Sequence, residues 1–423
     1  MEIKLADNLK IETNIPILHV EQFRYLWKPD CHALLKLEGY LDRNIRWNPE
    51  QPYNSRIKIW VENNTGGQII YHGYIVKVGI KNLGGTSQIN LEALSASCLL
   101  DRRVLSSSFQ NPVITFGEVV REAVQTEGGQ VIRDRENDKE IKNPVIRYEE
   151  TAWEFAKRLG CPMGNYIIPD IETGNPNIWF GMRKGKEVPA LQEDQCNVKM
   201  CTIGRKTGIF IEVEGRSFYK IGDRMTYLGQ KTTILEVQGR YERGELAFTY
   251  VLEDMSVHQP CSRYESTHAG LGLWGTVQEV KGETVKLALE IDDGKNTGDY
   301  FYPYCPETGN SLYAMPEKGA RALLYFFGGT EPNGTVIHCL NGNQNQGQYY
   351  KDRALDIEDG NSLSLSNEVV SVCRGQKHRL TLNDDSVTIK TSKDLKIVAE
   401  GKIRLKAKRI TVSTPDELNI CQG

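Results

Sequence analysis

Two pairs of adjacent carboxylates are the residues whose types and spacing could perform acid–base chemistry. They are Glu149-Glu150 and Asp292-Asp293. Enzymes that cleave glycosidic bonds use two carboxyl groups, one as the acid and the other as the base or nucleophile. Glu149 and Glu150, however, directly precede a helix start signal at Thr151, and the two aspartates precede a glycine, as in a turn. The sequence also has no glycine-rich phosphate loop and no Ser/His/Asp motif in a nucleophile context. We therefore predict that the protein is not an enzyme.

A second set of residues has the chemistry of metal ligands. His258 and Cys261 lie close together with His268 nearby, and Cys196 and Cys201 form another group. Zinc sites need three or four ligands at tight spacings, which neither group supplies. The ten cysteines are scattered without a CxxC motif, so we expect free thiols in a reducing cytoplasm. The sequence predicts no metal site and no cofactor.

A cluster of aromatic side chains could stack on nucleic-acid bases. The cluster consists of Tyr300, Phe301, Tyr302 and Tyr304. Single-strand sites combine such side chains with a basic groove. The surrounding segment is instead acidic, with Glu290, Asp292, Asp293 and Asp299. Because these carboxylates repel phosphates, we expect the aromatic residues to serve in packing and no nucleic acid to bind.

Composition places the chain among soluble proteins of several domains. It has 423 residues, of which 39% are hydrophobic and 25% charged, with a formal net charge of −3. This charge gives no overall attraction to nucleic acid or to an acidic membrane. No apolar run approaches the roughly 18 residues that a membrane-spanning helix needs. The start of the chain contains no apolar secretory region, so we expect no signal peptide.

The most informative pattern is a repeat of apolar pairs near the C-terminus. In each pair, two apolar residues flank a polar one, which is the alternation of a strand with one buried face. Polar stretches that fit turns, such as Asn383-Asp384-Asp385 and Glu400-Gly401, separate the pairs. The pairs are Leu380/Leu382, Val387/Ile389, Leu395/Ile397, Ile403/Leu405, Ile410/Val412 and Leu418/Ile420. A spacing of seven or eight positions kept over six units indicates a thin, stacked rod rather than a globular core.

The rod needs a way to bury its apolar pairs, because isolated short strands are marginal in water. One solution is a solenoid in which a single chain coils three units per turn. The other is a rod in which three chains each supply one face, which leaves few open strand edges. We favour the three-chain rod, because faces of about eight residues are long for a coil built on six-residue faces. The side chains of all the pairs would then form its core.

Upstream of the rod, the sequence predicts mainly β structure with a few helices. Short strand-like runs with Gly/Asn turns between them, such as 57–61 and 68–80, indicate small barrels. Alternating apolar residues from Val285 to Ile291 begin a segment that fits a small closed barrel of the OB type. The predicted divisions are a first barrel at 1–105, a helix-containing segment at 106–199, a second barrel at 200–258, a linker at 259–271, the OB-fold at 272–345, a linker at 346–362 and the rod at 363–423.

Two helices with the same start signal interrupt the β pattern. Thr115 and Thr151 each precede a glutamate by three positions, which is the spacing of a capping box. We expect the first helix to end at Gly128-Gly129 and the second at Gly160. Trp153 lies on the apolar face of the second helix and is expected to pack in the core rather than to bind a ligand.

Three segments carry motifs that occur together in a known family. Residues 95–110 contain a Leu-Leu-Asp-Arg stretch followed by serines and Phe-Gln, and residues 147–159 contain Tyr-x-Glu-Thr-x-Trp-x-Phe-x-x-Arg-Leu. Residues 275–327 end on a Pro-x-x-Gly phrase in which Ala320 stands where the family usually has aspartate. In this order, and followed by the β repeat, the segments resemble the VgrG-like spike proteins of contractile injection systems. That group includes type VI secretion spikes, hub–spike proteins of contractile phages and bacteriocin-like particles.

The resemblance implies a hub of two barrel-like domains, an OB-fold barrel and a C-terminal intertwined triple-stranded β-helix, the needle. It implies a homotrimer that adapts a sixfold tube to a threefold needle and punctures the target envelope. The implied partners are a tail-tube protein, baseplate proteins, a PAAR-type tip protein and possible effector cargo. The implied location is the bacterial cytoplasm within an assembled particle, which is delivered to or through the target cell envelope. The platform for the tip protein would consist of Leu418, Ile420, Cys421, Gln422 and Gly423.

Two further interpretations stay open at this stage. The basic residues of the needle are either a solvated outer face that prevents edge pairing or a surface attracted to an anionic envelope. They are Lys390, Lys393, Lys396, Lys402, Arg404, Lys406, Lys408 and Arg409. The alternative from a different class is a trimeric tail-fibre-like adhesin that binds surface glycans, although a fibre would not carry the hub and OB segments in this order.

Overall fold

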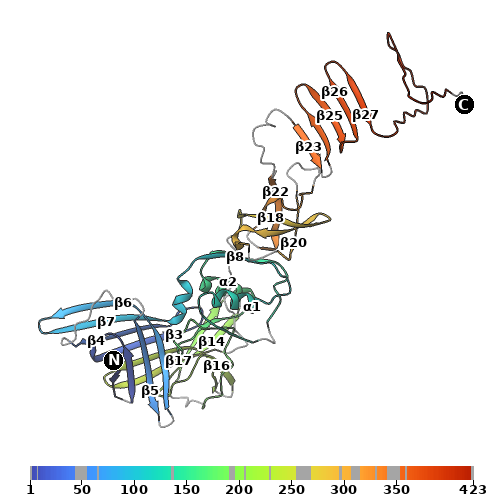
Figure 1. Ribbon diagram of the computed structural model, residues 1–423. Coiled ribbons are helices and arrows are strands. Elements are labelled where there is room, and N and C mark those ends of the chain that lie inside the picture. Colours follow the sequence, from blue (N-terminus) through green and yellow to red (C-terminus); the bar gives the residue numbers. More distant parts are fainter. Residues whose placement is uncertain are drawn as a thin grey trace. The chain divides into compact units, whose positions relative to one another are not determined.

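The chain forms two compact units, Met1–Asn341 and Gly342–Gly423, in a computed structural model (Figure 1). The structure describes residues 2–6, 8–42, 55–63, 66–134, 138–189, 196–203, 206–227, 230–253, 268–294, 298–305, 315–328, 331–340, 353–357 and 360–420. The fold is mainly β with a few helices, which confirms the predicted fold class. Within the described segments, no helix combines the length and apolar character needed to span a membrane.

A continuous twelve-stranded sheet is the largest element of the first unit. Its strands come from both segments predicted as barrels, which meet where β3 pairs antiparallel with β16. The sheet order is β1-β2-β5-β6-β7-β4-β3-β16-β17-β14-β13, and β15 pairs with β16. The strands are β1 (Glu2–Lys4), β2 (Leu9–Thr13), β3 (Ile17–Trp27), β4 (Leu34–Leu41), β5 (Arg56–Asn63), β6 (Gly66–Leu83), β7 (Thr86–Ser95), β13 (Cys196–Ile203), β14 (Lys206–Gly215), β15 (Arg224–Tyr227), β16 (Gln230–Glu242) and β17 (Glu245–Glu253).

One hydrophobic core serves this whole sheet. Trp27, Tyr71 and Tyr250 are fully or almost fully buried in the same cluster, although they come from both predicted barrel segments. The indole Nε1 of Trp27 donates to the carbonyl oxygen of Pro169 at 2.9 Å and so ties the sheet to the helical segment. Because the two segments share a sheet and a core, they form one hub rather than two independent barrels.

The helical segment lies between the two halves of the sheet in the sequence. It contains η1 (Ala96–Asp101), β8 (Leu105–Phe109), α1 (Phe116–Gln125), β9 (Val131–Arg133), β10 (Val145–Glu150), α2 (Ala152–Met163), β11 (Ile167–Pro169) and β12 (Ile178–Phe180). Strand β8 pairs antiparallel with β10, and β12 lies between β11 and β9 in a three-stranded sheet. The helices pack on these strands around a second buried cluster.

Both predicted capping boxes are confirmed. The hydroxyl oxygens of Thr115 and Thr151 accept hydrogen bonds from the N–H groups three residues later, at 3.3 and 3.1 Å. The prediction that α2 ends at Gly160 is wrong, because the helix continues to Met163 and its left-handed C-cap is Gly164, at φ 69°. Gly160 serves close packing instead, since a Cβ there would lie 2.8 Å from the carbonyl oxygen of Asn165.

The OB segment forms a closed five-stranded barrel, as predicted. Its strands are β18 (Gly272–Lys281), β19 (Thr284–Leu289), β20 (Phe301–Pro303), β21 (Arg321–Phe326) and β22 (Gly334–Leu340), in the order β20-β19-β18-β21-β22. The ring closes where Tyr304 bridges Val336 and the N–H of Cys305 donates to the carbonyl oxygen of Val336 at 2.8 Å. Two short turns, η3 (Glu290–Asp292) and η4 (Glu331–Asn333), connect the strands. Alternating side chains such as Val285, Leu287 and Leu289 fill the interior.

The second unit contains an antiparallel sheet of five consecutive strands. They are β23 (Arg353–Ile357), β24 (Asn361–Leu365), β25 (Val369–Arg374), β26 (His378–Asn383) and β27 (Val387–Thr391). Strand β23 lies inside the segment predicted as a linker, and the predicted linker at 259–271 falls mostly outside the described residues. In the single chain these strands pair with one another in a meander, so the intertwined three-chain form stays a prediction.

Replacing Thr151 by alanine tests the α2 cap. The variant loses the bond to the N–H of Glu154 and the hydroxyl bond to Asp101 Oδ1, which is 2.6 Å long. We expect the free energy of unfolding to fall by about 1–2 kcal/mol. Thr151→Ser, which keeps the hydroxyl, should stay close to the wild type. The measurement is urea unfolding of the full chain, and equal losses in both variants would contradict the assignment.

Candidate functional site

The candidate site is one face of the C-terminal sheet, where two rows of apolar side chains cross the strands. In the first row, Leu363 lies opposite Val372, Val372 opposite Leu380, and Leu380 opposite Ile389. The second row consists of Leu365, Val370, Leu382 and Val387, each opposite the next. Because side chains alternate along a strand, residues two apart point to the same side. Both rows therefore form one apolar surface, called here the apolar face.

The opposite side of the same sheet is polar. Ser364 lies opposite Ser371, which lies opposite Thr381, which in turn lies opposite Thr388. The hydroxyl oxygens of Ser364 and Ser371 are 2.6 Å apart and share a hydrogen bond. Since hydroxyls can bond to water, this side is suited to solvent and the apolar face is not.

The apolar face is open to solvent in the single chain. Val387 is 69% exposed and Ile389 is 56% exposed, whereas Leu287 in the OB barrel is fully buried. Monomeric soluble proteins rarely expose a contiguous apolar surface of this kind unless it binds something. The apolar face is therefore a candidate interaction surface.

Residues 392–420 continue the apolar repeat without forming strands. The structure describes all of them, and every one is exposed. Ile403 is 54% exposed and Leu405 is 74% exposed. Thus the predicted core residues Leu395, Ile397, Ile403, Leu405, Ile410, Val412, Leu418 and Ile420 are not brought together within one chain. Of the predicted tip platform, Leu418 and Ile420 are exposed, and Cys421, Gln422 and Gly423 lie outside the described residues.

The apolar repeat begins upstream of the pairs that the sequence pattern predicted. Leu363/Leu365 and Val370/Val372 have the same alternation and belong to the same two rows as Leu380 and Leu382. The alternation of these two pairs is visible in the sequence. The β25–β26 turn, in which Gly375 has φ 57°, lengthens the interval before Leu380 and interrupts the regular spacing. The apolar face therefore begins upstream of the six predicted pairs.

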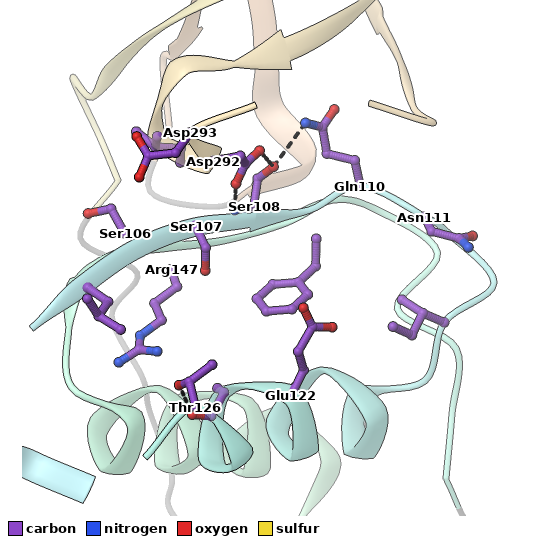
Figure 2. A pocket seen from close by; sticks show the side chains of 15 residues that line it. Ser106, Ser107, Ser108, Gln110, Asn111, Glu122, Thr126, Arg147, Asp292 and Asp293 are labelled. Atoms are coloured by element: carbon purple, nitrogen blue, oxygen red, sulfur yellow. Dashed lines mark hydrogen bonds between the residues drawn. The ribbon is translucent and has the colours of Figure 1, made fainter. Parts of the chain in front are cut away.

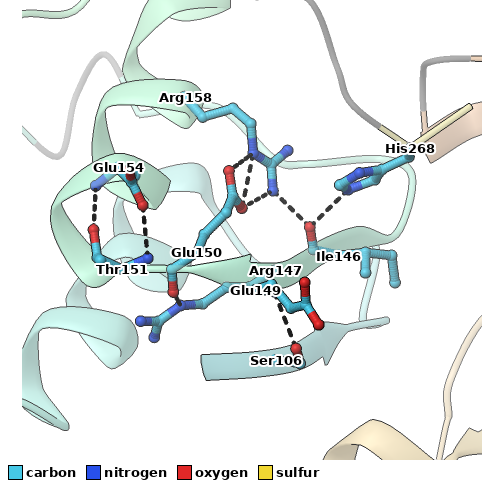
Figure 3. A network of polar contacts seen from close by, with 9 residues as sticks. All are labelled: Ser106, Ile146, Arg147, Glu149, Glu150, Thr151, Glu154, Arg158 and His268. Carbon is cyan, nitrogen blue, oxygen red and sulfur yellow. Dashed lines mark hydrogen bonds and ion pairs between the residues drawn. The ribbon is translucent and has the colours of Figure 1, made fainter. Parts of the chain in front are cut away.

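Glu149 and Glu150, the first carboxylate pair, directly precede the N-cap of α2, but one of the two side chains is buried. The carboxylate of Glu150 is buried and accepts hydrogen bonds from Arg158, from Nε at 2.8 and 3.1 Å and from Nη2 at 2.8 Å (Figure 3). Arg158 Nη2 also donates to the carbonyl oxygen of Ile146 at 2.5 Å, and His268 Nε2 lies 3.0 Å from the same oxygen. Only Glu149 is exposed. Glu150 therefore has a structural partner in Arg158.

The second pair is also more than a hairpin turn. Asp292 is buried at the end of η3 and accepts hydrogen bonds from the Ser108 N–H at 2.6 Å and the Ser108 hydroxyl at 2.5 Å (Figure 2). It thereby links the OB barrel to strand β8 of the hub. Burial raises the pKa of Asp292, although the two bonds from Ser108 act in the opposite direction. Asp293 is exposed and has φ 49°, which is the left-handed turn conformation.

The aromatic cluster packs in and on the OB barrel. Tyr302 is 1% exposed, and the Tyr300 ring contacts it edge-on with 5.0 Å between centroids. The ammonium groups of Lys281 and Lys286 lie 5.8 and 4.7 Å from the centroid of the Phe301 ring. These rings therefore have protein partners that account for their positions.

The candidate metal ligands do not converge in the described part of the chain. There, no three His, Cys, Asp or Glu residues are grouped so that they could hold a metal ion. His268 faces a backbone carbonyl, while His258 and Cys261 lie outside the described residues and Cys196 and Cys201 belong to β13.

The expectation of free thiols throughout is wrong at Cys161, which is disulfide-bonded. Free thiols are present at Cys31, Cys98, Cys305, Cys339 and Cys373.

The succession of a hub sheet with a helical segment, an OB barrel and a C-terminal β repeat is the fold of VgrG-like spike proteins. The solved structures with this fold include the E. coli c3393 protein, described as a component of the type VI secretion system with structural similarity to the T4 bacteriophage tail proteins gp27 and gp5. It superposes with a TM-score of 0.57 at 13% identity, over 78% of this chain and 99% of that chain.

A second similar structure is the lidded Francisella PdpA-VgrG complex. One of its chains matches with a TM-score of 0.57 at 9% identity, over 92% of this chain and 81% of that chain. The lidless PdpA-VgrG complex gives 0.55 at 9% identity, over 92% and 99%. No protein-family model matches the sequence, and no curated protein matches it. At these identities the likeness concerns the fold.

Replacing Glu150 by glutamine tests the buried ion pair. The variant leaves the Arg158 guanidinium buried without its counter-charge, so we expect the free energy of unfolding to fall by about 3 kcal/mol. Glu149→Gln is the matched control, because Glu149 is exposed at the neighbouring position and should change stability by less than about 0.5 kcal/mol. Both are measured by urea unfolding, and similar effects of the two substitutions would contradict the burial of the pair.

The raised pKa of Asp292 predicts a pH dependence of stability. Ionisation of this group opposes folding, so its contribution is complete below the unfolded pKa of about 4 and is lost as the pH rises through the folded pKa. Asp292→Asn cannot ionise. The free energy of unfolding of the wild type, relative to this variant, should therefore decrease as the pH rises from about 4. Urea unfolding at several pH values measures it, with exposed Asp293→Asn as control, and a difference independent of pH would refute the assignment.

Proposed function

We propose that the protein is the trimeric hub and spike of a contractile injection machine, of the type VI, phage-tail or bacteriocin kind. The observation that carries the proposal is the apolar face, which is open to solvent in the single chain and continues into the unpaired repeat at 392–420. A surface of this kind requires a partner. The VgrG-like fold of the chain supports a further copy of the same chain as that partner.

Three copies satisfy the needle's physical requirements. Each chain supplies one sheet, whose apolar face turns toward a common axis while the Ser/Thr side stays in solvent. Each Val, Leu or Ile that becomes buried contributes about 1.5–3 kcal/mol. The backbone of 392–420, which forms no strand alone, then pairs between chains, so this segment folds as the trimer assembles. A closed three-chain rod also leaves few open strand edges.

The threefold symmetry of the trimer has consequences for the hub and for the end of the needle. The two halves of the hub sheet would give six similar modules in the trimer, matching a sixfold tail tube. The needle would lead the tube through the target envelope, with a PAAR-type protein on the end that includes Leu418 and Ile420. Baseplate proteins and effector cargo are further proposed partners. The particle would assemble in the bacterial cytoplasm before delivery to or through the target cell envelope.

We propose a mechanical rather than a catalytic role. Both carboxylate pairs have structural positions, because Glu150 binds Arg158 and Asp292 binds Ser108. A glycan-binding tail fibre would account for the needle but not for the hub sheet and the OB barrel. The spike therefore explains more of the chain than the adhesin does.

Charged residues on the apolar face should dissociate the trimer. In the double variant Val387→Asp, Ile389→Asp, each chain loses two buried side chains and gains two charges that would need burial. Because each lost side chain removes about 1.5–3 kcal/mol, the association constant of the trimer should fall by at least about a thousandfold. Thr388→Asp, between them on the polar side, is the control and should stay trimeric. The measurement is light scattering after size exclusion. A double variant that stays trimeric, or a Thr388 variant that also dissociates, would contradict the proposal that the apolar face lies at the trimer axis.

A further inference from the structure

A cavity of about 450 Å³ lies beside strand β8 in the first unit (Figure 2). Its walls are β8, the Ala123–Thr126 side of helix α1, Arg147 from β10, and the η3 end at Ile291 to Asp293. A volume of this size suits a small organic ligand. None of the roles proposed above for the needle or the hub sheet uses this cavity.

Arg147 is a buried, charged side chain that lines the cavity. It is 2% exposed, and Figure 2 shows it pointing from the strand toward Thr126, the C-cap residue of α1. Its Nε donates to the carbonyl oxygen of Glu150 at 3.0 Å. Its Nη2 is buried and has no hydrogen-bond partner among the described residues. Burial lowers the pKa of Arg147, yet an arginine keeps its proton at neutral pH.

The two carboxylates whose charges act on Arg147 are already bound to other arginines. Glu127 and Glu150 are the acidic residues whose charges act on Arg147. Glu150 is held by Arg158, and Glu127 accepts two hydrogen bonds from Nε of Arg103, at 3.1 and 3.0 Å. Arg147 thus shares these two carboxylates with Arg158 and Arg103, each of which binds one of them directly. A buried charge without its counter-ion is unfavourable by several kcal/mol, so the place next to Arg147 favours an anion.

Several other polar groups that line the cavity are hydrogen-bond acceptors. Gln110 is 1% exposed, and its Nε2 donates to the Ser108 hydroxyl oxygen at 2.9 Å. Because the proton of that hydroxyl goes to Asp292, the network fixes the orientation of the amide. Gln110 Oε1 is then buried and has no partner in the part of the chain that the structure describes. Glu122 and Asp293 line the same cavity from exposed positions.

We propose that the cavity binds a zwitterionic ligand of the amino-acid or short-peptide class. Its carboxylate pairs with Arg147, and its N–H or ammonium groups face the oxygen atoms of Gln110, Glu122 and Asp293. A phosphate-rich ligand is disfavoured because Glu122 and Asp293 repel it. A purely apolar ligand is disfavoured because it leaves Arg147 without a counter-charge.

Calorimetric titration of the full chain tests the proposal with three probes: the tripeptide Ala-Ala-Ala, its C-terminal amide and inorganic phosphate. We expect saturable binding of the free acid, binding of the amide at least tenfold weaker, and no binding of phosphate. Arg147→Gln should abolish binding of the free acid. Equal affinity for acid and amide, binding of phosphate instead, or no saturable binding of the free acid at millimolar concentration would each overturn the proposal.

A second variant keeps the test decisive if Arg147→Gln fails to fold. Glu122 is exposed on α1, so Glu122→Gln should fold like the wild type and weaken binding of the tripeptide at least threefold. Glu283→Gln, which removes an exposed carboxylate from the β18–β19 turn, is the matched control and should leave the affinity unchanged. Unchanged binding in the Glu122 variant would contradict the proposed position of the ligand amine.

Discussion

The two-residue period of the C-terminal strands places their apolar side chains on one side of a sheet, and no other described strand of the second unit covers that side. Within the second unit, the rows from Leu363 to Ile389 and from Leu365 to Val387 face solvent, while the serine and threonine rows occupy the other side. A sheet buries one face against another layer or against another molecule. The described residues of the second unit form no such layer, and we propose that further copies of the chain supply it.

The first unit buries a hydrophobic core of its own. Its hub sheet is held together where β3 and β16 pair, and one core lies beneath both halves. Several buried polar groups of this unit also have partners within it. Glu150 neutralises Arg158, and Asp292 accepts hydrogen bonds from the N–H and the hydroxyl of Ser108. The first unit thus buries a hydrophobic core of its own, whereas the second unit leaves its apolar face exposed. Arg147 Nη2 and Gln110 Oε1 are among the buried polar atoms without a hydrogen-bond partner in the described residues, and the proposed ligand would supply partners for both.

Features that depend on near neighbours in the sequence could be predicted. The capping boxes at Thr115 and Thr151 need only four consecutive residues, and the OB strands show their alternation directly. Features that depend on distant segments could not. No local pattern indicates that β3 pairs with β16, that Glu150 is buried against Arg158, or that Asp292 bonds to Ser108. Gly160 shows the same limit, because a glycine that permits close packing and a glycine that ends a helix look alike in sequence.

For the needle, the sequence predicted the alternation of the pairs from Leu380/Leu382 onward but not the two upstream pairs that extend the apolar face. The number of chains that share this face is the central claim, and the mass of the wild-type protein in solution tests it most directly. Native mass spectrometry or sedimentation equilibrium at micromolar concentration should give three times the chain mass of 47.8 kDa. A stable monomer of 47.8 kDa would contradict the account, because the apolar face would then stay in water with no partner.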